Sequence, residues 1–266
     1  MRNPRILEVF AANILSRRFF CTNRLLQNAQ GNFNEDFNNS RIAVSNPQRV
    51  LLGVGSSVMS LVDPYRADMI AIMGETTGIA AMKYMKTRME NDPEGIRILK
   101  NQPRINSSTV DLEKLKSLPD ETLGRRYYNF LEVNKVTPDS RDMVRFVDDL
   151  ELAYVIQRYR EIHDLVHTLL DMPINMLGEV TVKWVEAFQT RLPLCVLGGL
   201  FGAVRLAPKQ RQNYVNFYLP WAVETGMKSK FLMNVYFEER WEQPMSELLE
   251  ELNIKPLVLP NKKSTS

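Results

Sequence analysis

The chain has 266 residues, enough for one large domain or two small ones, and its composition is that of a soluble globular protein. The first 26 residues contain five arginines and one glutamate, a net charge of +4. The formal net charge of the whole chain is +3, so the remaining residues carry a net charge of −1. This near-neutral body has no basic stripe to bind phosphate backbones, which excludes nucleic acid as a partner. Cys21 and Cys195 form no CxxC pair, which favours a reducing compartment.

Residues 1–26 have the makeup of a mitochondrial transit peptide, because they are rich in arginine and nearly free of acidic residues. Arg17 and Thr22 lie within "RRFFCT", a stretch that resembles a matrix-processing site. An ordinary basic helix is the alternative. A secretory signal is excluded, since Glu8 and Asn13 interrupt the apolar core that it would need.

Residues 27–46 are polar and rich in asparagine, so we expect a linker there. Helix signals follow, beginning with the cap-then-proline pairs at residues 46–47 and 63–64. Apolar periodicity and these start signals predict helices within residues 48–62, 65–73, 76–90, 111–119 and 120–134.

The longest predicted helix runs from Asp148 to Met172 without glycine or proline, and Pro173 ends it. One face is apolar at helical spacing and includes both histidines of the chain. A second apolar strip consists of Leu150, Tyr154, Leu165 and Leu169. We therefore expect a central helix with neighbours on two sides.

Further helices are predicted within residues 174–192, 193–206, 207–227 and 246–253, and no useful length of period-2 alternation occurs. The sequence thus predicts an all-α fold of about eight to ten helices over residues 47–254, with a tail at 255–266. The longest apolar run, Leu192–Val204, has 13 residues. A membrane span needs about 20, so no transmembrane helix is predicted.

Gly198 and Gly202 form a GxxxG pattern within that apolar run, which lets helices approach closely. One interpretation is a tightly packed, buried helix. The other is a helix that dips into a membrane surface, aided by basic residues at its ends. These are Arg191, Arg205, Lys209 and Arg211.

The only two histidines, His163 and His167, lie four residues apart in the longest predicted helix. Residues i and i+4 share a helix face, so both imidazoles can point at one place on an otherwise apolar surface. A buried imidazole needs a partner, and a metal ion is one solution. Two histidines satisfied within the core are the alternative.

Carboxylates near this pair offer further ligands. Asp164 borders the histidine face, and Asp171 continues the row but equally suits a cap on the next helix. Glu179 lies beyond Pro173, where a helix hairpin would return it to the pair, although an ion pair with Lys183 is an alternative. Glu161 points to the far side. A zincin helix reads HExxH, whereas the second position here is Asp164 and no third histidine follows, so a metalloprotease is not expected.

The stretch "HDLVHTLLDMPINMLGE" resembles the HDxxH-x11-E signature of the family named for the fourth protein of coenzyme Q (ubiquinone) biosynthesis. "LGRRYYNFLEVNKVTPDSR", "GEVTVKWVEAFQTRLPL", "PWAVETG" and "LMNVYFEERWE" are also similar, and the likeness extends over roughly residues 40–254. The resemblance implies an all-helical fold and a zinc ion on His163, Asp164, His167 and Glu179.

The resemblance also implies a mitochondrial protein, peripheral on the matrix side of the inner membrane, within a multiprotein coenzyme Q synthesis complex. Its implied substrate is a polyprenylated aromatic lipid, 4-hydroxy-3-methoxy-5-polyprenylbenzoate, which loses its C1 carboxylate. A homodimer is compatible with this assignment. No catalytic residue is assigned, and two histidines with a carboxylate equally suit Fe²⁺ by ligand type.

Two functional hypotheses remain from the sequence. The first is a metal-dependent carboxy-lyase, in which one ligand position must stay open for the substrate. The second is a non-catalytic scaffold that binds lipid or partner enzymes around a structural zinc. Methionines offer adaptable apolar surface for an isoprenoid tail, or simply a methionine-rich core. They are Met69, Met73, Met82, Met85 and Met89.

Overall fold

Helices make up the regular structure of this chain, for which a computed structural model describes residues 33–63 and 66–260. The α-helices are α2 (Asn46–Val62), α3 (Ala67–Thr77), α4 (Ile79–Glu90), α5 (Pro93–Asn101), α6 (Leu112–Ser117), α7 (Leu123–Asn134), α8 (Leu150–Leu169), α9 (Met176–Thr190), α10 (Pro193–Val204), α11 (Pro208–Asn213), α12 (Leu219–Lys228) and α13 (Met245–Glu251). The described residues contain no strand, only an isolated bridge between Thr122 and Pro244. The all-α prediction is confirmed. The predicted transit peptide lies outside the described residues.

The number of helices exceeds the expected eight to ten, because the described part of the chain has twelve from α2 to α13. No helix was predicted over α5, which begins at Pro93 and ends shortly before Pro103. The helix expected over residues 207–227 is divided by a π-helical turn at Tyr214–Tyr218, just before Pro220. Three short 3₁₀ turns, η1 (Pro138–Ser140), η3 (Leu232–Asn234) and η4 (Phe237–Glu239), connect helices.

Residues 33–40 are helical, whereas the sequence alone predicted a linker over residues 27–46. Phe33 and Phe37 are 0% and 2% exposed and belong to the main hydrophobic core. The ring of Phe33 meets that of Tyr154 edge-on at 5.4 Å between centroids. Two aromatic residues at i and i+4 therefore anchor an asparagine-rich segment that composition alone assigns to a loop.

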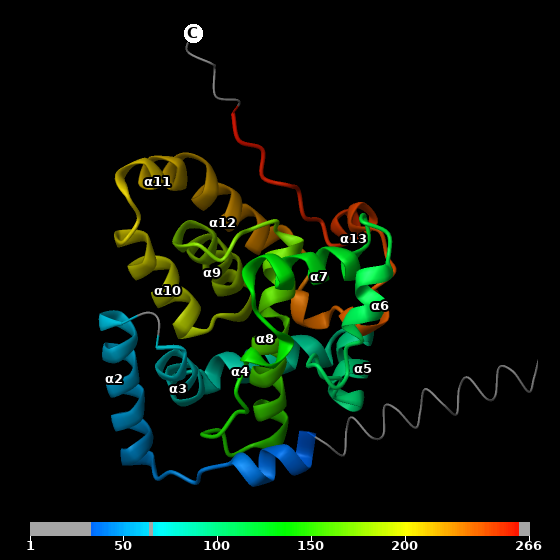
Figure 1. Cartoon of the computed structure of the whole chain (residues 1–266). Coiled ribbons are helices and arrows are strands. Elements are labelled where there is room, and N and C mark those ends of the chain that lie inside the picture. The colour runs from blue at the N-terminus through cyan, green and yellow to red at the C-terminus, as the bar shows by residue number, and fades with distance from the viewer. Residues whose placement is uncertain (1–32, 64–65, 261–266) are drawn as a thin grey trace, which may run out of the picture.

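Helix α8 runs through the middle of the molecule, with α4, α7 and α9 around it (Figure 1). Asp149 caps its first turn by accepting a hydrogen bond from the backbone N–H of Leu152. Sixteen of its twenty residues are buried, including charged ones such as Arg158 and Glu161. The predicted central helix is present, and it buries a polar side as well as its apolar strips.

Helix α10 packs closely against α9, at the left of Figure 1. A Cβ on Gly202 would lie 2.6 Å from Cγ2 of Val180, and one on Gly199 would lie 2.9 Å from the Trp184 ring, so only glycine allows this approach. The outer side of α10 stays exposed, with Val204 67% accessible. The fully buried interpretation of this helix is therefore wrong. None of the described helices has the length and apolarity to cross a membrane.

Replacing Phe37 with alanine tests whether residues 33–40 belong to the folded unit. Loss of this buried ring should lower the free energy of unfolding by about 3 kcal/mol or more, because it leaves a cavity in the core. Asn38→Ala, on the exposed side of the same turn, should change it by less than about 0.5 kcal/mol. Urea denaturation followed by circular dichroism measures both, and equal stability of the two variants would contradict the assignment.

Candidate metal centre

The turn between α8 and α9 brings a glutamate back to the histidine pair. Helix α8 ends at Leu169, and Asp171 adopts a left-handed φ of 50° that reverses the chain. The side chain of Asn175 caps α9 by accepting from the backbone N–H of Gly178. Glu179 consequently lies in the first turn of α9, facing the last turns of α8, as the predicted hairpin required.

Both imidazoles are oriented by hydrogen bonds from their Nδ1 atoms. Nδ1 of His163 lies 2.6 Å from Oε1 of Glu186, and Nδ1 of His167 lies 2.9 Å from the backbone carbonyl oxygen of Met172. Each acceptor requires an N–H at Nδ1, which leaves the lone pair on Nε2. His163 is 7% and His167 0% exposed, so both lone pairs are buried.

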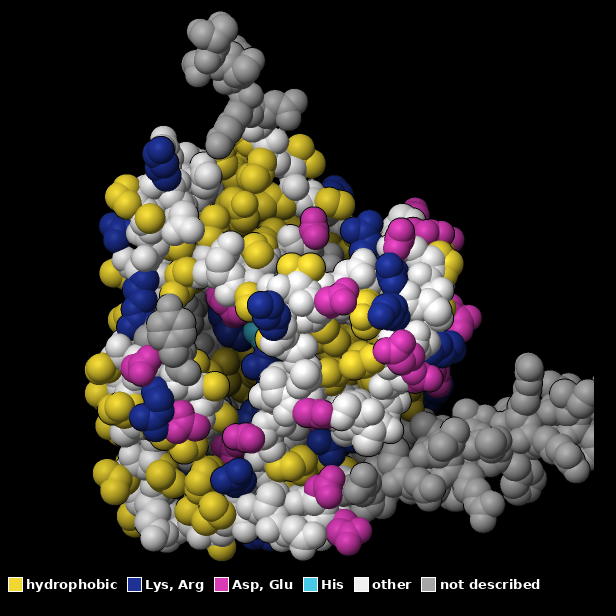
Figure 2. All heavy atoms as spheres, viewed as in Figure 1, with side chains coloured by type: hydrophobic (Ala, Val, Ile, Leu, Met, Phe, Trp, Pro, Cys, Tyr) yellow, Lys and Arg dark blue, Asp and Glu magenta, His cyan; other side chains and the backbone are white. Residues whose placement is uncertain are grey.

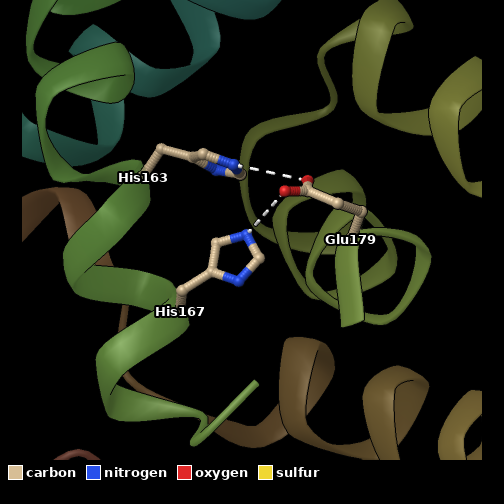
Figure 3. A group of neighbouring side chains, drawn as sticks. All are labelled: His163, His167 and Glu179. Carbon is tan, nitrogen blue, oxygen red and sulfur yellow. Dashed lines mark ion pairs between the residues drawn. The ribbon is translucent and has the colours of Figure 1, made fainter. Parts of the chain in front are cut away.

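The two Nε2 atoms converge on the carboxylate of Glu179 (Figure 3). Nε2 of His163 lies 3.6 Å from Oε2, and Nε2 of His167 lies 3.5 Å from Oε1. One ligand atom from each residue falls within 4.8 Å of the others. Ligands about 2.1 Å from a tetrahedral zinc ion lie about 3.4 Å from one another, so the two nitrogen–oxygen distances fit a shared cation.

The buried lone pairs and the negative charge of this group also require a cation between them. The buried Nε2 of His167 has no hydrogen-bond partner, since 3.5 Å to Glu179 exceeds the usual range of about 2.7–3.2 Å. Lone pairs aimed at a carboxylate repel it unless a proton or a metal ion lies between them. Two neutral imidazoles and a carboxylate are a common donor set, so His163, His167 and Glu179 can hold a metal ion.

The pKa values of these residues reflect the same balance. Burial raises the pKa of Glu179, but hydrogen bonding and charge from the two histidines lower it by more, so this carboxylate is ionised. Burial lowers the pKa of His163, but the charge of Glu186 and the hydrogen bonds to Glu179 and Glu186 together raise it by more, to above the ordinary 6.5. Without a metal ion, a proton on His163 therefore provides the charge that the glutamates need.

The other predicted carboxylates do not join this group. Asp164, the fourth ligand implied by the family resemblance, is buried and accepts a hydrogen bond from Nη2 of Arg141 at 2.7 Å. Asp171 is exposed in the turn after α8. Glu161 pairs with Arg104 at 2.7 Å, on the far side of α8 as expected. The structure thus brings together three of the four predicted ligands.

Tyr159 and Glu186 beside the centre were not singled out from the sequence, and Lys183 was considered only as an ion-pair partner of Glu179. Glu186 accepts from Nζ of Lys183 at 2.7 Å and from the hydroxyl of Tyr159 at 2.8 Å, besides orienting His163. Lys183 therefore pairs with Glu186 and not with Glu179. The available signal was the spacing of Glu179, Lys183 and Glu186 at i, i+4 and i+7, a polar stripe on a largely apolar helix.

A cavity of 670 Å³ opens beside the centre, and His163 and Glu179 form part of its wall. Residues of α2, α3 and α10 also line it, including Leu61, Ile70 and Phe201. Figure 2 shows the hollow, with dark-blue lysine and arginine side chains and a trace of cyan histidine inside it. Of the methionines considered for an isoprenoid tail, Met73 lines the cavity. The others contribute elsewhere, with Met82, Met85 and Met89 at 0% exposure in the core.

Sequence comparison identifies the family. The model for the coenzyme Q (ubiquinone) biosynthesis protein Coq4 matches residues 38–258, which include the whole of α8 and α9. The chain belongs to the Coq4 family. The Coq4 match confirms the resemblance seen in the HDxxH-x11-E stretch and places the protein in ubiquinone biosynthesis.

Curated relatives carry the same family name. The mitochondrial ubiquinone biosynthesis protein COQ4 homologue of Mus musculus is 56% identical over 209 residues, which cover 79% of each chain. The COQ4 homologue of Bombyx mori is 53% identical over 232 residues, covering 87% of this chain and 90% of its own. Both relatives are named mitochondrial, which agrees with the prediction of a mitochondrial protein.

A crystal structure of a Nostoc punctiforme protein, described as a ubiquinone biosynthesis protein, has a similar fold. The TM-score is 0.63 at 18% sequence identity, and the match covers 80% of this chain and 100% of that one. At this identity the likeness supports the arrangement of the helices alone.

The metal content of two variants tests which residues bind the ion. His167→Gln should lose most of the bound metal, because its Nε2 has no other partner. Asp164→Asn should retain far more, because the carboxylate of Asp164 is held by Arg141. Elemental analysis of both purified proteins, with folding checked by circular dichroism, measures the difference. Equal loss from both would make Asp164 a ligand.

Metal affinity should depend on pH through His163, because a proton and a metal ion compete for its Nε2. The raised pKa of His163 means that protonation begins above pH 6.5, so affinity should already fall there, by about tenfold per pH unit below the pKa. Glu186→Gln removes the charge that raises this pKa and should move the fall to lower pH. Competition with a fluorescent chelator measures the shift, and an unchanged profile would contradict this role of Glu186.

Proposed function

We propose that this protein is a metal-dependent carboxy-lyase of ubiquinone biosynthesis that removes the C1 carboxylate of 4-hydroxy-3-methoxy-5-polyprenylbenzoate. The observation that supports this most is the buried His163–His167–Glu179 group in the wall of a large, mainly apolar cavity. Such a cavity suits an aromatic ring with an apolar tail, and the three polar ligands lie where the reacting end of the ring would reach.

A metal ion at this centre would supply Lewis-acid stabilisation of the negative charge that develops when the C1–carboxyl bond breaks. The chain's own residues hold the centre in place. Glu186 and the carbonyl oxygen of Met172 orient the two imidazoles, and Glu179 contributes the single charged ligand. The apolar lining near Leu194 and Leu197 limits water around the bond that breaks. CO₂ leaves and C1 gains a proton.

Three protein ligands favour a catalytic centre over a purely structural one. Structural zinc sites are usually closed by four protein ligands, whereas catalytic sites have three and an open position. Because Asp164 is paired with Arg141, a metal ion held by His163, His167 and Glu179 would keep one coordination position open for the substrate. We propose Zn²⁺ as the resident ion, with Fe²⁺ as the second candidate on the basis of ligand type.

The mouth of the cavity suits delivery of a lipid from the inner membrane. Helix α2 carries no charged residue between Arg49 and Asp63, and its outward side is apolar. Its most exposed apolar residues are Val50, Leu51, Val54, Val58 and Val62, each more than half accessible. Phe201 of α10 lines the cavity, and we propose that these α2 residues, with Phe201 and Val204, form an apolar rim that faces the matrix side of the inner membrane, from which the rest of the tail would extend into the bilayer.

The exposed apolar rim also supports the alternative function, a lipid-binding scaffold that organises the coenzyme Q synthesis complex. In that case the metal ion is structural and its removal unfolds the protein. In the lyase case chelation abolishes turnover while the helical circular dichroism persists. Thermal denaturation with and without a chelator distinguishes the two functions.

The direct test is release of labelled CO₂ from carboxyl-labelled prenyl-hydroxybenzoate by the purified, metal-containing protein. Glu179→Gln removes the charged ligand and should reduce release to the level measured without protein. Glu224→Gln, at an exposed site on α12 paired with Lys228, is the matched control and should leave the rate unchanged. Wild-type release by Glu179→Gln would refute the catalytic assignment, and no release by the wild-type protein would favour the scaffold.

A further inference from the structure

Four cationic side chains line the cavity beside the metal centre. They are Arg141, Arg160, Lys183 and Arg205. Arg160 is occupied by Glu75 at 2.7 Å, and Arg205 reaches the backbone carbonyl of Leu61 at the end of α2. The remaining two, Arg141 and Lys183, lie next to the three metal-binding residues and retain hydrogen-bonding capacity.

Lys183 lies one helical turn after Glu179 and is held in a fixed position. Its Nζ donates to Glu186 at 2.7 Å and to the hydroxyl of Tyr159 at 3.2 Å. The third neighbour, Nδ1 of His163 at 3.4 Å, already donates to Glu186 and cannot accept. An ammonium group has three N–H donors, so one donor of Lys183 remains for a ligand in the cavity.

Arg141 approaches the same group from the segment that follows η1. Its Nη2 donates to Asp164, but its buried Nε has no hydrogen-bond partner. A guanidinium group has five N–H donors and the Arg141 side chain is 32% exposed at the cavity wall, so donors other than the buried Nε–H remain for a ligand oxygen. Burial lowers the pKa of both Arg141 and Lys183, but nearby carboxylates raise both pKa values by more; the main ones are Asp164 for Arg141 and Glu186 for Lys183, and Glu179 contributes to both.

The charges around the centre favour one further anion. Glu186 balances Lys183, and Asp164 balances Arg141. A divalent ion with Glu179 as its single charged ligand leaves a net charge of +1. A carboxylate supplies one negative charge and several acceptor positions, which matches the two free donors.

We propose that Lys183 and Arg141 form a two-point subsite for the substrate's carboxylate, and that Lys183 determines the preference for an acid over a neutral phenol. This assignment rests on the proposed function, because it places an aryl acid in the cavity. A carboxylate held there lies beside His163 and Glu179, with its ring toward the apolar part of the cavity.

Calorimetric titration of the metal-containing protein with geranyl-4-hydroxybenzoate and with the matching geranylphenol, which lacks the carboxyl group, tests the subsite. Wild-type protein should bind the acid about 10- to 100-fold more tightly than the phenol, as expected for charged hydrogen bonds. Lys183→Met should reduce that ratio about tenfold or more and leave phenol binding unchanged. Lys183→Arg should preserve it. Arg205→Met, which removes a cavity cation that donates to the backbone carbonyl of Leu61, is the matched control and should also preserve it.

Metal content and circular dichroism are measured for every variant, so that loss of the centre is not mistaken for loss of the subsite. If Lys183→Met does not fold, Lys183→Gln replaces it. A full acid preference in the variant with its metal retained overturns the subsite and leaves the proposed function intact. Failure of the wild-type protein to bind either compound overturns the proposed function and the subsite together.

Discussion

Helix α8 is buried on nearly every side although it carries charged residues, and each of these charges requires a partner. The pairs are Arg158 with Glu238, Arg160 with Glu75, Glu161 with Arg104, His163 with Glu186, and Asp164 with Arg141. Breaking a buried pair typically costs about 3–5 kcal/mol, because the remaining charge is left in an apolar environment. Elements around α8, including α3, α9 and η4, each contribute a partner and are thereby positioned around it.

The metal centre follows from this arrangement of partners. Asp164 and His163 are neighbours on α8, but Asp164 is paired with Arg141, whereas His163 is oriented by Glu186. Glu179 belongs to neither arrangement, so it is available to both Nε2 atoms. Because Glu186 also holds Lys183 and Tyr159, one buried carboxylate connects the metal-binding histidine with a cation in the wall of the cavity.

The sequence predicted the features that depend on local periodicity. The i, i+4 spacing of His163 and His167 required a shared face, and Pro173 marked the turn that returns Glu179. Prediction failed where long-range contacts decide. The buried helix around Phe37 lies in an asparagine-rich stretch, and the exposed side of α10 is as apolar as its buried side.

The sequence by itself determined the all-α class, the family and the presence of a histidine pair with nearby carboxylates, because helical spacing and motif spacing are local properties of the chain. Only the tertiary structure decided which carboxylate meets the histidines, since Asp164 and Glu179 are chemically alike and differ in their neighbours. It also placed Lys183 and Arg141 beside them at the cavity wall. Those placements depend on packing between helices that sequence spacing does not specify.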